Sequence, residues 1–152
     1  VLAVFIISED HVDLGGRLQA KGANLRKVSD LDGSAKLLSY AIRANGLDPE
    51  NWYQLALTHQ KRGDLKAAES AYARSVQLGE LAGSVSFDAT FNHACMLQAL
   101  NRTAEASDTF QRAVEVGAPP GPQRQRKEAD AQHNWGLTLL KMERYEDAGL
   151  IF

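Results

Sequence analysis

NWYQLALTHQKRGDLKAAESAYARSVQL, from Asn51 to Leu78, is the segment that indicates the fold most clearly. Apolar and small residues recur in it at helical spacing, first around Trp52 and again from Leu65. Between the two segments, Arg-Gly-Asp at residues 62–64 supplies a glycine that suits a helix end and an aspartate that suits a helix start. The stretch therefore predicts two helices joined by a tight turn.

The same skeleton occurs four times with constant internal spacing. Steps of sixteen and then four residues connect Leu18 with Ser34 and Leu38, Trp52 with Ala68 and Tyr72, Thr90 with Ala106 and Phe110, and Gln132 with Ala148 and Phe152. The starting points are 34, 38 and 42 residues apart, so extra length falls only between the windows. Stacked helical repeats accept insertions in this way, because the packed unit is left intact. We therefore expect an all-α fold of stacked antiparallel helix-turn-helix hairpins.

Small residues stand at matching places in each window and predict close packing of its two helices. They are Gly22, Ala56, Ala94 and Gly136 in the first helices, and Ser34, Ala68, Ala106 and Ala148 in the second. A small side chain at both places lets two backbones approach, and a large residue four positions further along fills the space beside them. One hairpin cannot bury this face alone, so neighbouring hairpins must stack.

These residues carry a resemblance to the tetratricopeptide repeat (TPR) family, whose pattern is Trp-x2-Leu-Gly-x2-Tyr followed by Ala-x3-Phe. The second window matches with Trp52, Leu55, Ala56, Gly63, Ala68 and Tyr72, and the fourth has Trp135-Gly136 in the Leu-Gly slots. The resemblance implies a right-handed α-solenoid of about four repeats, at 15–47, 49–82, 87–118 and 129–152, the last of them truncated. Residues 1–14 are interpreted as the end of a preceding helix or an N-terminal segment.

In TPR-like stacks the first helix of each repeat lines a concave groove, and the resemblance places three residues of each such helix there. The predicted peptide-binding groove consists of Tyr53, Gln54, Leu57, Phe91, Asn92, Cys95, His133, Asn134 and Leu137. Within this set, the aromatic row consists of Tyr53, Phe91 and His133, and the amide row consists of Gln54, Asn92 and Asn134. A side-chain amide can bond a peptide backbone whatever side chains the peptide carries. The alternative is that these are ordinary solvated or packing residues.

The best-known TPR activity, a carboxylate clamp for chaperone tails, is not supported by the residues present. A clamp needs lysine and arginine to hold a terminal carboxylate. The register puts Asp88 and Asp130 at the expected lysine positions, and Asn92 and Asn134 at the expected arginine positions. A basic partner segment fits such acidic residues better than an acidic tail does, although helix N-termini favour acids in any case.

Residues 117–127 form a proline-rich insertion that ends in a basic cluster, Arg124, Arg126 and Lys127. We interpret it as an exposed loop, which is either simply solvated or a docking site for an acidic partner. A second insertion spans residues 79–86.

The bulk composition limits the classes of function. A net charge of −2 does not favour nucleic-acid binding, and the apolar run at residues 1–7 is too short to span a membrane. A single cysteine, Cys95, excludes an internal disulfide and fits a cytoplasmic or other reducing compartment. His93 and Cys95 project from different sides of one helix, so they form no catalytic pair, and we expect no cofactor, no metal site and no catalysis.

We therefore expect a protein–protein interaction or scaffold module that binds a peptide or partner subunit, as a piece of a longer protein and within a multiprotein assembly. The alternative is a non-catalytic regulatory or substrate-recognition segment of a larger enzyme. Because the sequence stops inside an apolar helix, we also expect further repeats or a partner chain to cover that end.

Overall fold

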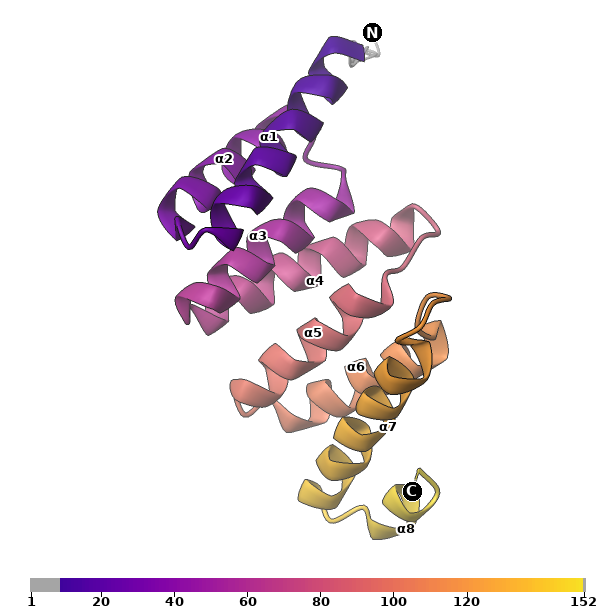
Figure 1. Cartoon of the computed structure of the whole chain (residues 1–152). Coiled ribbons are helices and arrows are strands. Elements are labelled where there is room, and N and C mark those ends of the chain that lie inside the picture. Colours follow the sequence, from indigo (N-terminus) through magenta and orange to yellow (C-terminus); the bar gives the residue numbers. More distant parts are fainter. Residues whose placement is uncertain (1–8, 152) are drawn as a thin grey trace, which may run out of the picture. The chain divides into compact units, whose positions relative to one another are not determined.

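A computed structural model describes the backbone of residues 9–151, and within them the chain forms eight helices and no strand. The helices are α1 (Glu9–Lys27), α2 (Leu31–Ala44), α3 (Pro49–Arg62), α4 (Leu65–Leu81), α5 (Phe87–Ala99), α6 (Thr103–Val116), α7 (Arg124–Lys141) and α8 (Tyr145–Gly149). Figure 1 shows that successive helices form antiparallel hairpins, such as α1 with α2. The all-α prediction is confirmed.

The chain divides into two compact units, and the division falls within α4. Unit 1 runs up to Ala71, and in it α2 packs against both α1 and α3. Unit 2 starts at Tyr72, and in it α6 packs against both α5 and α7, with the short α8 on α7. In each unit, the second helix of one repeat thus packs between the first helix of the same repeat and the first helix of the next repeat.

The turn inside each repeat has the same backbone conformation. A left-handed residue follows the first helix in every case, with φ of 68° at Ser29, 80° at Gly63, 60° at Asn101 and 60° at Glu143. The next residue then donates its backbone N–H to the carbonyl five residues earlier, as Asp64 does to His59 at 3.0 Å. This bond defines the Schellman turn that ends a helix. The same bond joins Asp30 to Leu25, Arg102 to Leu97 and Arg144 to Leu139.

These four turns confirm the register deduced from the sequence. Ser29, Gly63, Asn101 and Glu143 are separated by the same 34, 38 and 42 residues that separate the sequence windows. The predicted caps of the second repeat are also present: Asp48 accepts from the Glu50 N–H at 2.9 Å, and Asp64 accepts from the Ala67 N–H at 3.2 Å.

We expect Glu143→Gly to raise the free energy of unfolding of unit 2 by about 1 kcal/mol, because a side chain makes the left-handed conformation costly. Glu143→Ala is the matched control, since it removes the same carboxylate but keeps the strain. Urea titrations of the three proteins measure the difference. Equal midpoints for the glycine and alanine variants would show that this position is not strained.

The small residues predicted to permit close packing are buried in both units. In unit 1, a Cβ added at Gly22 would lie 2.8 Å from Cγ of Leu38, which is fully buried. Ser34 and Thr58 share a buried hydrogen bond of 2.9 Å in the same unit. In unit 2, Ala94 and Ala106 form one apolar cluster with Leu97 and the fully buried Phe110. The slot predicted for Phe152 lies outside the described residues.

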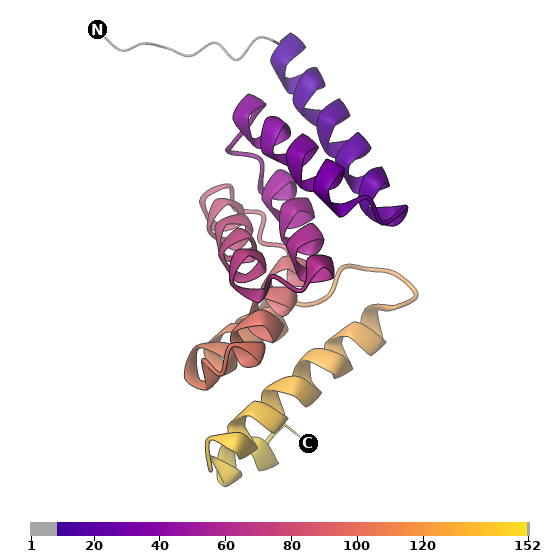
Figure 2. The same ribbon diagram turned by 90° about the vertical axis from the view of Figure 1, so that its left-hand side faces the viewer.

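Three boundaries differ from those inferred from the sequence. Helix α1 begins at Glu9, so residues 9–14 are continuous with the first helix of the first repeat, while residues 1–8 lie outside the described part. Helix α4 continues to Leu81 and therefore includes Gly79. A glycine suits this position, because a Cβ there would sit only 3.0 Å from the Ser84 carbonyl oxygen. Helix α7 begins at Arg124, which leaves residues 117–123 as the open connection visible in Figure 2.

Candidate functional site

In unit 1, the predicted groove residues lie on α3 and are all half-buried. Gln54 directly follows Tyr53, and Leu57 comes about one helical turn after Gln54. Gln54 and Leu57 therefore share a face of the helix. The Gln54 side chain donates to Glu50 Oε1 at 2.6 Å, while its own Oε1 atom is buried without a hydrogen-bond partner among the described residues. One amide of the predicted row is therefore held by the acid one turn before it.

In unit 2, side chains of α5 and α7 meet at both ends of the two helices. Lys127 Nζ lies 2.7 Å from Asp88 Oδ1 near their N-terminal ends, and Gln98 Nε2 donates to Thr138 Oγ1 at 3.4 Å further along. The predicted groove residues lie between these two links: Phe91, Asn92 and Cys95 on α5, and His133, Asn134 and Leu137 on α7. The fold thus brings the unit 2 members of the set onto neighbouring helices.

The amides of unit 2 retain hydrogen-bonding capacity. Asn92 and Asn134 occupy the same register position of their repeats, and both are half-buried. Asn134 Nδ2 donates to the Asp130 carbonyl at 2.7 Å, which fixes the side chain. Within residues 9–151 its amide oxygen accepts no hydrogen bond, and the Asn92 side chain makes none. Both can therefore bond a ligand.

Phe91 packs inside unit 2, a role that its interpretation as part of an aromatic contact row did not include. Its ring is stacked on Phe87, with centroids 5.9 Å apart and planes 5° from parallel, and it is tilted against Phe110 at 5.8 Å. It is half-buried against the apolar cluster of α5 and α6. On α7, by contrast, Leu137 is 43% exposed.

Cys95 is a packing residue. Burial raises the pKa of its thiol to about 11, because a thiolate would lose its hydration there. The side chain packs against the cluster that contains Leu97 and Phe110. At neutral pH it is therefore a thiol, and a thiol is a poor nucleophile and a poor metal ligand.

The basic residues interpreted as an exposed loop lie instead in the first turn of α7. Arg124 pairs with Glu128 at 2.9 Å and Arg126 with Asp130 at 3.9 Å, both four residues apart. Such pairs support a helix, which is the physical reason why the loop ends earlier than expected. With Lys127 bound to Asp88, the three cations are largely matched by acids of unit 2 itself, and two of these acids are the ones expected to line the groove.

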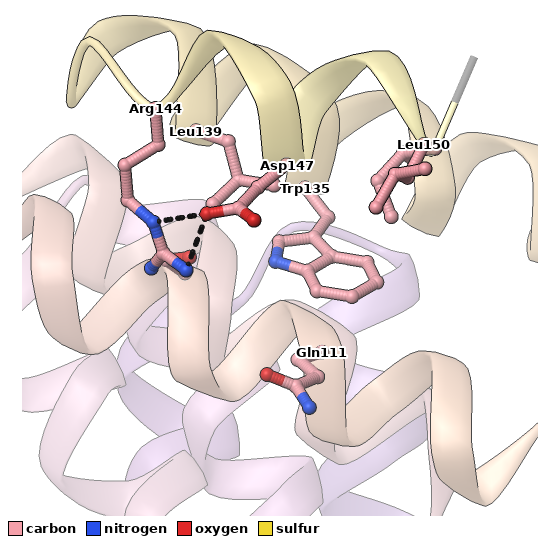
Figure 3. Close-up of a pocket in the computed structure, with 8 residues that line it drawn as sticks. Gln111, Trp135, Leu139, Arg144, Asp147 and Leu150 are labelled. Atoms are coloured by element: carbon pink, nitrogen blue, oxygen red, sulfur yellow. Dashed lines mark hydrogen bonds and ion pairs between the residues drawn. The ribbon is translucent and has the colours of Figure 1, made fainter.

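A cavity of about 280 Å³ lies among α6, α7 and α8, away from the predicted groove residues. Figure 3 shows the Trp135 indole and Leu139 on one side of it, and the dashed contacts between Arg144 and Asp147. Its other lining residues are Ser107, Gln111, Leu150 and Ile151. These residues give it an apolar wall and one ion pair of 2.8 Å, without a nucleophile beside a base.

Among the side chains of residues 14–151, no three histidine, cysteine or acidic groups converge as metal ligands would. No helix in that range combines the length and the apolar character needed to cross a membrane. The pKa of His59 is lowered, mainly because burial disfavours the charged imidazolium, so this side chain is a neutral part of the packing.

Comparison with known proteins identifies the repeat. The sequence model of the tetratricopeptide repeat matches residues 49–78, which form α3 and most of α4. The chain contains a tetratricopeptide repeat. Its other repeats share the turn geometry of that segment at Ser29, Asn101 and Glu143. No curated protein matches the sequence.

Solved TPR structures are similar in fold at low sequence identity. YrrB, described as a TPR protein with an unusual peptide-binding site, has a TM-score of 0.73 at 16% identity, and the match covers 86% of this chain and 61% of YrrB. MamA has a TM-score of 0.75 at 15% identity, with 91% and 74% covered. The type III secretion translocator chaperone SycD of Yersinia enterocolitica has a TM-score of 0.73 at 17% identity, with 84% and 85% covered.

One charged feature of this TPR protein was not singled out from its sequence. Arg26, near the end of α1, and Lys61, near the end of α3, line a cavity of about 430 Å³ with Leu57 and Gln60. The signal was present, because Lys61 follows Leu57 by one helical turn and therefore shares its face. The approach of Arg26 could not be deduced without the packing of α1 on α3.

Proposed function

We propose that this TPR protein is a protein-interaction module that binds an extended segment of a partner protein on the exposed face of α5 and α7, as one component of a multiprotein assembly. The observation that carries the proposal is the pair of amides, Asn92 and Asn134. They stand at the same place in consecutive repeats and keep hydrogen-bonding groups that the described part of the chain does not use.

The chemistry of this face suits a peptide backbone. An amide side chain donates and accepts at once, so two amides on neighbouring helices can bond two separate peptide groups of the same extended chain. Leu137 adds exposed apolar surface beside them, which favours contact with apolar side chains of the partner. Side-chain pairs at both ends of α5 and α7 hold the two amides in place before binding, which lowers the entropy cost.

Charge argues against a free C-terminal carboxylate as the recognised group. Asp88 and Asp130 stand where a carboxylate clamp needs lysines, and their own counter-charges come from Lys127 and Arg126. We further propose that the chain does not insert into a membrane and does not bind nucleic acid, since its net charge of −2 offers no attraction to a phosphate backbone. The protonated Cys95 thiol supports a role without catalysis.

The test starts from peptides selected on the wild-type protein from a random display library. We expect Asn92→Ala together with Asn134→Ala to weaken the selected peptides about tenfold, the effect of about 1.4 kcal/mol for lost hydrogen bonds. Fluorescence anisotropy measures the dissociation constants. Gln111→Ala is the control, because it removes an exposed amide from α6 that bonds Glu115 instead. Unchanged affinity in the double variant, with helical content intact, would move the site away from this face.

A further inference from the structure

We infer that unit 1 carries a separate site for an acidic side chain of a partner peptide, formed by Arg26 and Lys61 beside Leu57. The inference rests on the proposed role as a protein-interaction module, but it does not rest on the amide face of unit 2. It also differs from a terminal-carboxylate clamp, because the two cations lie near the C-terminal ends of their helices and recognise an acid within a chain.

Both cationic groups are positioned by backbone carbonyls. Arg26 Nη1 donates to the Gln54 carbonyl at 3.2 Å, which draws the guanidinium from α1 across to α3. Lys61 Nζ donates to the Arg26 carbonyl at 2.9 Å and lies 3.4 Å from Ser29 Oγ, which draws the ammonium back to the end of α1. Each of the two helices thus supplies a cationic side chain that bonds a carbonyl of the other helix, and both side chains line one cavity of about 430 Å³.

Neither cation has a carboxylate partner among the side chains of residues 14–151. The nearby acids are engaged elsewhere: Asp32 pairs with Arg62 at 3.3 Å, and Asp30 accepts from the Gly33 N–H at 2.9 Å. Asp64 caps α4. Guanidinium and ammonium groups carry five and three donors respectively, so each keeps several after bonding its carbonyl. The cavity therefore has the donors and the charge that a carboxylate requires.

The rest of the surface selects a peptide side chain over a nucleic acid. Leu57 lines the same cavity, so an apolar residue next to the acid has a surface to cover. Asp30 and Asp32 line the adjoining cavity with Lys61 and would repel a continuous phosphate backbone. The fitting occupant is thus a glutamate or aspartate flanked by an apolar residue in an extended partner segment.

The probe is a fluorescein-labelled ten-residue peptide of alternating glutamate and leucine, blocked at both ends so that no terminal carboxylate is present. The same peptide with glutamine in place of glutamate is the neutral control. We expect the wild-type protein to bind the glutamate peptide at least tenfold more tightly in anisotropy titrations. Arg26→Gln together with Lys61→Gln should abolish this preference.

Arg62→Gln is the matched control, because it removes one positive charge from the same end of α3 but from an arginine already paired with Asp32. We expect it to change the affinity for the glutamate peptide less than twofold. Because Lys61 also bonds the end of α1, circular dichroism and Trp52 fluorescence confirm that each variant is folded. Arg26→Glu together with Lys61→Glu provides a second readout, since it should transfer the preference to a peptide of alternating lysine and leucine.

Equal affinity of the wild-type protein for the glutamate and glutamine peptides would overturn the inference. So would a loss of affinity in Arg62→Gln as large as that in the double variant. The amide variant Asn92→Ala with Asn134→Ala, tested on the same peptides, separates the two proposals. If it alone removes binding of the glutamate peptide, the acidic site is wrong. If only the Arg26 and Lys61 variants do so, the acidic site stands, and the unit 2 face is decided separately by the affinity of its selected peptides.

Discussion

Phe110→Ala is expected to lower the free energy of unfolding of unit 2 by about 3–5 kcal/mol, the usual cost of emptying a buried aromatic site. The Phe110 side chain is fully buried and contacts a cluster that includes Leu97 and Ala106. The Phe91 ring is tilted against it with centroids 5.8 Å apart, so the substitution would also remove an aromatic contact. Because α6 packs on both α5 and α7, neither neighbour can close the space without losing its own contacts.

The two tryptophans allow this loss to be assigned to one unit. Trp52 belongs to unit 1, whereas Trp135 packs against the Phe110 cluster in unit 2. In a Trp52→Phe background, urea unfolding followed by fluorescence therefore reports on unit 2 alone. Gln111→Ala, one residue along α6 and exposed, should change the stability by less than about 0.5 kcal/mol. A Phe110→Ala loss below about 1 kcal/mol would contradict the packing described.

Gly22→Ala and Gly16→Ala are expected to change the stability of unit 1 in opposite directions, although both place alanine within α1. At Gly22 the new Cβ would lie 2.8 Å from Leu38 Cγ and 3.3 Å from the Ser34 carbonyl, and relieving such overpacking costs about 1–3 kcal/mol. At Gly16 nothing lies within 4 Å of the new Cβ, so the higher helix propensity of alanine should add up to about 1 kcal/mol.

Urea unfolding followed by fluorescence measures these changes too, with Trp135→Phe as the background so that Trp52 reports on unit 1. Each glycine variant is compared with that background by its urea midpoint and slope. Two stabilised variants would mean that α1 and α2 are further apart than described, and two destabilised variants would mean that α1 does not extend through Gly16 as a helix.

Much of the fold was predictable because the repeat is marked by residues whose role is local. Gly63 ends a helix in the left-handed conformation, Asp64 caps the next, and Ala68 fits where two helices touch; each needs only its neighbours in sequence. Asn101 and Glu143 adopt the same conformation at a cost, and only the constant spacing revealed them. Helix ends were harder to predict, since Arg124 begins α7 with the help of an ion pair one turn later.

The candidate site was less predictable because it depends on which helices meet. Register alone placed Asn92 and Asn134 at equivalent positions, but only the packing of α5 and α7 on α6 places them on neighbouring helices. Phe91 has the same register position as Tyr53, yet Phe87 and Phe110 draw it into the packing of unit 2. Arg26 reaches α3 through the packing of α1, across 28 residues of sequence from Gln54, and no local pattern signals such a contact.

The connection at residues 117–123 offers a place to divide the molecule. Its residues 119–123 are all exposed, whereas Ala118 just before them joins one apolar cluster with Ala131 of α7. Helix α7 is also tied to α5 by the Lys127–Asp88 pair. A chain severed in this stretch would have both new ends in solvent, so the two pieces could be produced separately and reassembled. An isotope label could then be confined to α7 and α8, which would give the last repeat its own magnetic resonance spectrum.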